Sequence, residues 1–130
     1  MMKPISVWKQ ELAGGTHTAR LASLYCCSPE QPAAHAARYA AVLDGLEATF
    51  GAHTEAGLYS APGRTEIGGN HTDHQHGRVL AGSVNIDMIA AAAPNDKNQL
   101  RVQSEGYDLC VIDLDDLEAR KEEELSLIHI

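Results

Sequence analysis

The stretch APGRTEIGGNHTDHQHGRVL, residues 61–80, gathers many hydrogen-bonding side chains between glycines. Arg64 is a fixed cation with five donors, Asp73 is a carboxylate acceptor, and His71 can both donate and accept. A ligand with many hydroxyl groups needs this mixture on a pre-shaped loop, and each charged hydrogen bond to it contributes ~1.5–3 kcal/mol. The glycine-bounded segment 71–77 is therefore predicted to be a functional loop.

The residues before this stretch predict helices. Residues 5–24 read as one or two short helices interrupted at Gly14–Gly15. A longer, alanine-rich helix is expected from a start at Ser28 and Pro29 to Phe50. Its expected apolar stripe consists of Tyr39, Leu43, Leu46 and Phe50. Gly51 is its expected C-cap.

The residues around and after the stretch predict strands. Residues 58–61 and 65–67 read as two short strands separated by a bend at Pro62–Gly63. Further strands are expected at 79–80, 84–93, 100–104 and 109–114. Helices followed by a β-meander indicate an α+β fold.

Three segments follow from this pattern. Residues 1–56 form a helical lead-in, and residues 57–124 carry the polar stretch and the β-meander. Residues 125–130, LSLIHI, turn abruptly apolar after an acidic run, so we expect a non-native or frayed tail and a truncated chain.

Composition excludes several classes of partner. The formal charge is −8 and the ten Lys and Arg residues are scattered, so we expect no nucleic-acid partner. No apolar run approaches the ~20 residues that span a bilayer, and an acidic surface disfavours anionic membranes. The three cysteines, two of them adjacent, do not form a disulfide framework, and reduced thiols indicate the cytoplasm.

The polar stretch resembles the galactokinase signature. In that signature a Gly-Arg pair, here Gly63–Arg64, precedes a Gly-Glu-His-Thr-Asp run, here residues 69–73. Residues 77–80 and 84–87 are similar to the family's following strand, and the resemblance covers about residues 57–118. It implies a partial N-terminal domain of the GHMP-type kinase fold, also called ribosomal protein S5 domain 2-like.

The resemblance also implies roles for individual residues. Arg64 matches the arginine that stabilises the transition state in that family, so it is the expected catalytic residue. The four-residue substrate-binding segment corresponds to Asn70, His71, Thr72 and Asp73. Asn70 replaces the family's glutamate, so the contact to the far hydroxyl of the sugar carries no charge here.

The implied activity is ATP-dependent phosphorylation of galactose to galactose 1-phosphate by the full-length parent. ATP and Mg²⁺ are the implied cofactors, and galactose is the expected small-molecule partner. The family's glycine- and serine-rich phosphate loop and its catalytic aspartate do not occur in these residues. We therefore expect the chain by itself to be inactive, with no cofactor-binding residue and no metal site of its own.

Two alternatives remain open at this level. The cluster His71, Asp73, His74 and His76 has the ligand types of a metal-binding hydrolase. A non-catalytic sugar-binding sensor could also use the same fold and the same polar loop. A bound-metal assay separates the first alternative from sugar binding.

Overall fold

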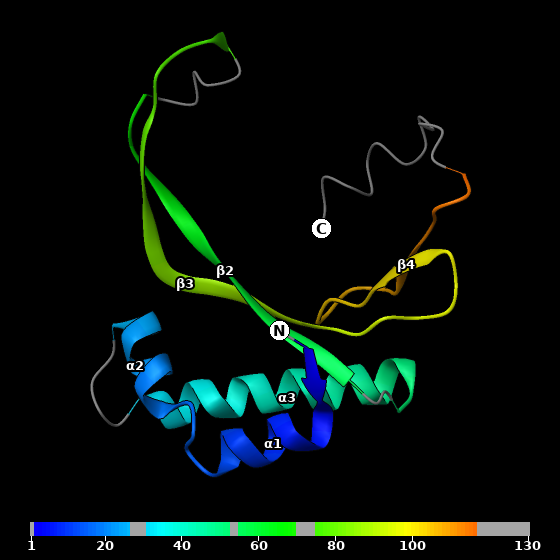
Figure 1. Ribbon diagram of the computed structural model, residues 1–130. Helices are drawn as coiled ribbons and strands as arrows, with labels where there is room; N and C mark the ends of the chain where they lie inside the picture. Colours follow the sequence, from blue (N-terminus) through cyan, green and yellow to red (C-terminus); the bar gives the residue numbers. More distant parts are fainter. Residues whose placement is uncertain (1, 27–30, 53–54, 70–74, 117–130) are drawn as a thin grey trace. The chain divides into compact units, whose positions relative to one another are not determined.

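The computed structural model describes residues 2–26, 31–52, 55–69 and 75–116, and Figure 1 shows its elements. The chain divides into two compact units, residues 1–93 and 94–130, which are treated separately below. The first unit contains β1 (Met2–Pro4), α1 (Ile5–Ala13), α2 (Thr18–Tyr25), α3 (Pro32–Phe50), β2 (Glu55–Gly68) and β3 (Leu80–Ala92). The second contains β4 (Gln99–Val102) and β5 (Cys110–Asp113).

The three helices largely follow the sequence pattern. The expected interruption of residues 5–24 is confirmed, because α1 ends at Ala13 and Gly15 adopts a left-handed φ of 73°. The expected start of the long helix is wrong. α3 begins at Pro32, with Gln31 as its N-cap, and Ser28 and Pro29 lie outside the described residues. Pro32 suits the first helical position because it has no N–H to leave unpaired.

The core of the first unit lies between the helices and one face of the sheet (Figure 1). Leu43 of α3 is fully buried, and Phe50 at the end of the predicted stripe is partly buried. The predicted stripe is therefore the face on which α3 packs. The buried core residues are Ile5, Leu12, Leu21, Tyr25, Tyr39, Leu43, Leu46 and Ala56. Among the helices that the structure describes, none is both long and apolar enough to cross a membrane.

The sheet of this unit has the order β1-β2-β3 and is antiparallel throughout. β1 was not expected, because three residues show no alternation; it pairs only with residues 55–57. The two short strands predicted at 58–61 and 65–67 are one continuous strand, β2. Proline is tolerated at position 62 because β2 has no β1 partner there and because the ladder bulges at this point.

The bulge changes the register between β2 and β3. Pro62 pairs with Asp87 and Arg64 pairs with Ser83, so residues 84–86 of β3 lie opposite Gly63 alone. A Cβ at Gly63 would lie 3.1 Å from the Val84 side chain and 3.2 Å from a backbone oxygen of β3. A larger residue at this position would therefore need the bulge to shift.

The expected single meander is two separate hairpins. β4 and β5 pair only with each other, from Gln99↔Asp113 to Val102↔Cys110. The turn before β4 is held locally, because the Asn95 side chain accepts from the backbone N–H of Lys97 and donates to the Gln99 carbonyl oxygen. The α+β class is thus confirmed, with short antiparallel sheets in place of one meander.

One carboxylate joins the β2–β3 hairpin to two helices. The Asp87 side chain of β3 is only 4% exposed. It accepts hydrogen bonds from the Tyr25 hydroxyl of α2 at 2.5 Å, the Ser60 hydroxyl of β2 at 2.6 Å and the Arg38 guanidinium of α3 at 2.9 Å. The hydroxyls of Tyr25 and Tyr39 lie 2.9 Å apart, so α2 and α3 share this cluster. We call Asp87 and its three donors the Asp87 cluster.

The electrostatics of the Asp87 cluster favour the charged carboxylate. Burial works to raise the pKa of Asp87, but the hydrogen bonds from Ser60, Tyr25 and Arg38 outweigh it and hold the pKa below its ordinary value. Burial and donation to Asp87 raise the pKa of the Tyr25 phenol, so this group stays a donor. At neutral pH the Asp87 carboxyl is therefore ionised and the Tyr25 phenol is protonated.

The outward face of the hairpin is apolar and uncovered among the described residues of this unit. Tyr59, Ile86 and Met88 are 54%, 75% and 71% exposed. They alternate with Leu58 and Ile89, which pack against the core, so they lie on the opposite face of the sheet. The Tyr59 ring covers Gly57, where a Cβ would lie 2.9 Å from the ring.

The pH dependence of stability tests the Asp87 cluster. A depressed folded-state pKa contributes stability above the unfolded pKa of about 3.9, and that contribution is lost as the pH falls through the folded pKa. Asp87→Asn should therefore lower the unfolding temperature by a constant amount from pH 7 to about pH 5, with a difference that shrinks below about pH 4. Thermal unfolding followed by circular dichroism measures it. Glu11, whose pKa is also lowered, titrates in both proteins and cancels from the difference. A gap that persists unchanged at pH 3 would contradict the assignment.

Dye binding tests the outward face. Exposed apolar clusters bind hydrophobic dyes and promote association. The double variant Ile86→Thr, Met88→Thr should reduce dye fluorescence and self-association of the 130-residue chain, with about 0.5 kcal/mol or less of change in unfolding free energy for each exposed site. Leu24→Gln on α2, where the side chain is also exposed, is the matched control and should leave the dye signal unchanged. Equal dye signals in the double variant and the original chain would refute this reading of the face.

Candidate functional site

The structure places one of the predicted site residues. Arg64 lies on β2, directly after the bulge, where it pairs with Ser83 and is exposed. The substrate-binding segment predicted at Asn70, His71, Thr72 and Asp73 lies outside the described residues. The geometry of the site is therefore known from the strand that carries Arg64 and from the two ends of the loop.

The bulge next to Arg64 puts its extra residues on β3 and none on β2. Along β2, Ser60, Pro62 and Arg64 occupy alternate positions and so belong to the same face of the strand. Ser60 on this face donates to Asp87 and faces the helices. Arg64 therefore lies on the helix side of the hairpin, two positions beyond the residue that pairs with Asp87.

The two ends of the polar loop approach each other closely. Gly69 has a left-handed φ of 114°, and a Cβ there would lie 2.6 Å from the Arg78 carbonyl oxygen and 2.6 Å from the Val79 Cα. Such distances exclude any side chain without backbone movement, so this position requires glycine. The backbone at Gly69 is therefore in close contact with the backbone at residues 78 and 79, and the loop predicted from the sequence begins just after this contact.

The histidine cluster weighed as a metal site falls mainly outside the described residues. His71, Asp73 and His74 are among the residues not described, and His76 is exposed with an unusual left-handed φ of 62°. Within the ranges that the structure describes, no three His, Cys, Asp or Glu side chains are grouped so as to hold a metal ion. The structure therefore offers no geometric support for the metal alternative.

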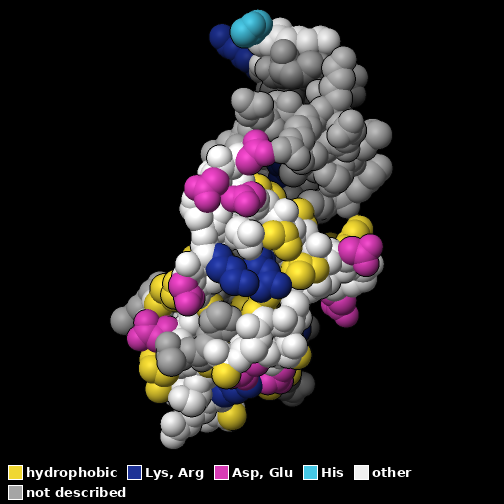
Figure 2. Space-filling view, turned by 90° about the vertical axis from the view of Figure 1, so that its right-hand side faces the viewer, with side chains coloured by type: hydrophobic (Ala, Val, Ile, Leu, Met, Phe, Trp, Pro, Cys, Tyr) yellow, Lys and Arg dark blue, Asp and Glu magenta, His cyan; other side chains and the backbone are white. Residues whose placement is uncertain are grey.

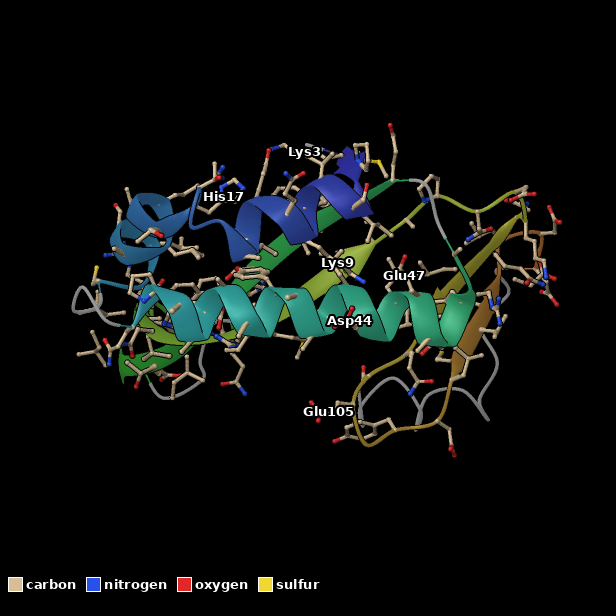
Figure 3. The ribbon with its side chains drawn as sticks, turned by 90° about the horizontal axis from the view of Figure 1, so that it is seen from below. Lys3, Lys9, His17, Asp44, Glu47 and Glu105 are labelled. Atoms are coloured by element: carbon tan, nitrogen blue, oxygen red, sulfur yellow. The ribbon has the colours of Figure 1, made fainter. Side chains whose placement is uncertain are left out.

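Two ionic clusters elsewhere in the first unit join secondary-structure elements. Figure 3 shows Lys9 of α1 beside Asp44 and Glu47 of α3, with Nζ 2.6 Å from a carboxylate oxygen of each. These hydrogen bonds raise the pKa of Lys9. Pairs of this kind, open to solvent, contribute little stability individually. These ion pairs link α1 to α3.

The second ionic cluster centres on Glu11 of α1. Lys3 Nζ and His17 Nε2 each lie 2.7 Å from Glu11 Oε2, and these hydrogen bonds lower the pKa of the carboxyl. Lys3 also stacks over the Trp8 ring at 4.7 Å. Figure 2 shows basic, acidic and hydrophobic side chains among the described residues. Neither ionic cluster includes Arg64.

Two shallow hollows lie near the helices. One is lined by α1, α2 and α3, including Leu12, Leu21 and Pro32. The other lies between Tyr25, His35 and Asn85, where the His35 ring stacks on Tyr25 with centroids 3.7 Å apart. Neither hollow is lined by Arg64.

The sequence reasoning missed the contribution of Asp87. The sequence predicts a strand at residues 84–87 and indicates no role for the carboxylate. The available signal is that Asp87 is the one charged residue of β3, because a buried charge requires several donors. The partners Tyr25, Arg38 and Ser60 could not be found from spacing, since Tyr25 lies 62 residues from Asp87 along the chain.

Comparison with known proteins agrees with the signature in the polar stretch. The family model described as the galactokinase galactose-binding signature matches residues 46–94, from the last turns of α3 to the end of β3. A galactokinase of Ligilactobacillus salivarius (strain UCC118) is 35% identical over 83 residues. The match covers 62% of this chain and 21% of the relative, so the chain spans about a fifth of that protein's length. No solved structure matches.

The match includes Arg64, Gly69 and the whole predicted sugar-binding segment. It begins in the last turn of α3, before the start at residue 57 that the resemblance predicted. The resemblance to galactokinases predicted from residues 61–80 is thereby confirmed: the chain carries a match to the galactokinase galactose-binding signature over residues 46–94.

Proposed function

We propose that the full-length protein containing this chain transfers the γ-phosphate of ATP to the anomeric hydroxyl of galactose. The observation that carries the proposal is the match of the galactose-binding signature over residues 46–94. In this proposal the chain belongs to the N-terminal domain of a GHMP-type kinase and supplies the sugar side of the active site. The domain boundaries 1–56, 57–124 and 125–130 belong to the same proposal.

The sugar is held by residues 70–73, which lie between β2 and β3 in the sequence. Asp73 accepts hydrogen bonds from two adjacent hydroxyls, and His71 and Thr72 add donors and acceptors. Asn70 contacts the far hydroxyl through a neutral amide. Gly69 supports this proposal, because its close backbone contact with residues 78 and 79 fixes where the segment starts.

Arg64 acts on the phosphoryl group as negative charge develops during transfer. Its exposure on β2 leaves the guanidinium accessible to a ligand, and its position on the helix side of the hairpin is set by the strand alternation. A guanidinium suits phosphate oxygens because it can donate two parallel hydrogen bonds.

ATP and Mg²⁺ are the proposed cofactors of the full-length protein. The phosphate loop and the catalytic aspartate expected for such a kinase do not occur in these residues. Other parts of the full-length protein would hold ATP and Mg²⁺ and supply the phosphoryl donor. Free Cys26 and Cys110 are compatible with the proposed cytoplasmic location.

Two substitutions separate sugar binding from transition-state stabilisation. In the full-length protein, Asp73→Ala should raise the KM for galactose on the order of 10- to 100-fold, because a charged hydrogen bond is lost. Arg64→Ala should lower kcat on the order of 100-fold with a smaller change in KM, because its charge acts mainly in the transition state. Galactose-dependent ADP release measures both constants.

The matched controls are Asp96→Ala and Arg20→Ala, which remove the same charges from exposed positions outside the signature loop. Both should leave kcat and KM within about twofold of the wild type. An inverted pattern, with KM raised by Arg64→Ala and kcat lowered by Asp73→Ala, would refute the assigned roles. If the protein binds galactose but releases no ADP, the sugar-sensor alternative replaces the kinase. Hydrolysis that depends on a metal ion bound by the purified protein would favour the hydrolase alternative.

The 130-residue chain by itself should release no ADP above background when supplied with ATP, Mg²⁺ and galactose. The physical reason is that phosphoryl transfer needs positioned phosphates and an oriented nucleophile, and these residues offer only the sugar side. A coupled ADP assay on the purified chain, with heat-denatured chain as the blank, tests it. Sustained galactose-dependent ADP release would show that the chain supplies more than the sugar side of the active site, contrary to the proposal.

A further inference from the structure

The Asp87 cluster lies at the root of the hairpin arm that carries Arg64. Asp87 pairs with Pro62, and the bulge follows at once, before the pair Arg64↔Ser83. Beyond the bulge the two strands form a two-stranded arm as far as Gly68↔Leu80, with a second register shift between Glu66 and Gly68. The three donors to Asp87 come from α2, α3 and β2, so the cluster fixes this root against both helices.

A two-stranded arm needs such a fixed root. An isolated pair of strands is marginally stable and twists more than a wide sheet. A small rotation at the root is therefore carried along the arm to Arg64 and to the loop that starts at Gly69. Arg64 also lies on the same strand face as Ser60, which donates to Asp87.

We propose that Asp87 is a positioning residue that sets the direction of the β2–β3 arm and thereby places Arg64 for phosphoryl transfer. This inference rests on the proposed kinase function. Asp87 acts through Arg64 and has no contact with substrate in this role. The ionised carboxylate suits the task because it accepts from Tyr25, Ser60 and Arg38 at once.

An amide replaces this carboxylate only with a loss of interaction energy. Asn at position 87 has no charge to pair with the Arg38 guanidinium and keeps one acceptor oxygen. If that oxygen accepts from Arg38, the Tyr25 and Ser60 hydroxyls must reverse and accept from the NH₂ group; if it accepts from the hydroxyls, the NH₂ group opposes the donors of Arg38. Asp87→Asn is thus a nearly isosteric change that disrupts the root.

Kinetics on the full-length protein give the first test. Asp87→Asn should lower kcat on the order of tenfold at a temperature well below unfolding, because a misplaced catalytic group loses much of its effect. Tyr25→Phe removes a single donor and should lower kcat by a smaller factor. Asp44→Asn, which removes an exposed carboxylate of α3, is the control and should change kcat by less than about twofold.

A double-mutant cycle shows whether Asp87 acts through Arg64. In the Arg64→Ala background, Asp87→Asn should lower kcat by less than about twofold further, because the group that it positions is already gone. A purely structural role predicts the same factor in both backgrounds. Equal factors would overturn the proposal, even if Asp87→Asn lowers the unfolding temperature.

Hydrogen exchange gives a readout that does not depend on activity. In Asp87→Asn, amides of residues 63–68 and 80–87 should exchange at least several-fold faster, while those of α1 keep their wild-type rates. Unchanged exchange in the arm would overturn the proposal whatever the kinetics show. If the wild-type protein does not phosphorylate galactose, the proposed function fails, and the exchange rates still decide whether Asp87 fixes the arm.

Discussion

The first unit depends on the solvation of one buried charge. Removing a carboxylate from water is strongly unfavourable unless protein donors replace the lost hydration. Asp87 meets this requirement with donors from α2, α3 and β2, so the charge can be accommodated only when these elements are in place together. Apolar packing around Leu43 holds the layers together without specifying one arrangement, and the Asp87 cluster supplies the directional constraint.

Much of the helical part could be predicted because its signals are local. The interruption at Gly14–Gly15 and the stripe through Leu43 follow from backbone freedom and from a 3.6-residue period. The start of α3 was misplaced because Pro29 and Pro32 both suit a first helical position, and the spacing cannot choose between them. The strands were harder. Pro62 reads as a break, and only the pairing with β3 shows that the ladder continues through a bulge.

In the candidate site, too, features set by neighbouring residues could be predicted, and contacts between residues far apart in the sequence could not. The motif from Gly63 to Asp73 predicts the resemblance to the galactokinase signature because its residue types are contiguous. The structure adds the position of Arg64 on the hairpin and the requirement for glycine at position 69. The Asp87 cluster was not predictable, because its members are separated by up to 62 residues and meet only in the folded chain. Residue types close together in the sequence therefore predict the galactose-binding signature, whereas the contacts that support the β2–β3 hairpin appear only in the folded chain.

The bulge opposite Gly63 has a consequence for how this hairpin can change in evolution. Three residues of β3 face one residue of β2, an excess of two, and strand alternation repeats every two residues. The arm therefore keeps its inside and outside across the irregularity, and Arg64 stays on the same side as Ser60. Insertions or deletions of two residues at this point preserve that orientation, whereas a change of one residue turns every later side chain of the altered strand to the other face. Length variation among relatives should accordingly be restricted to even steps here.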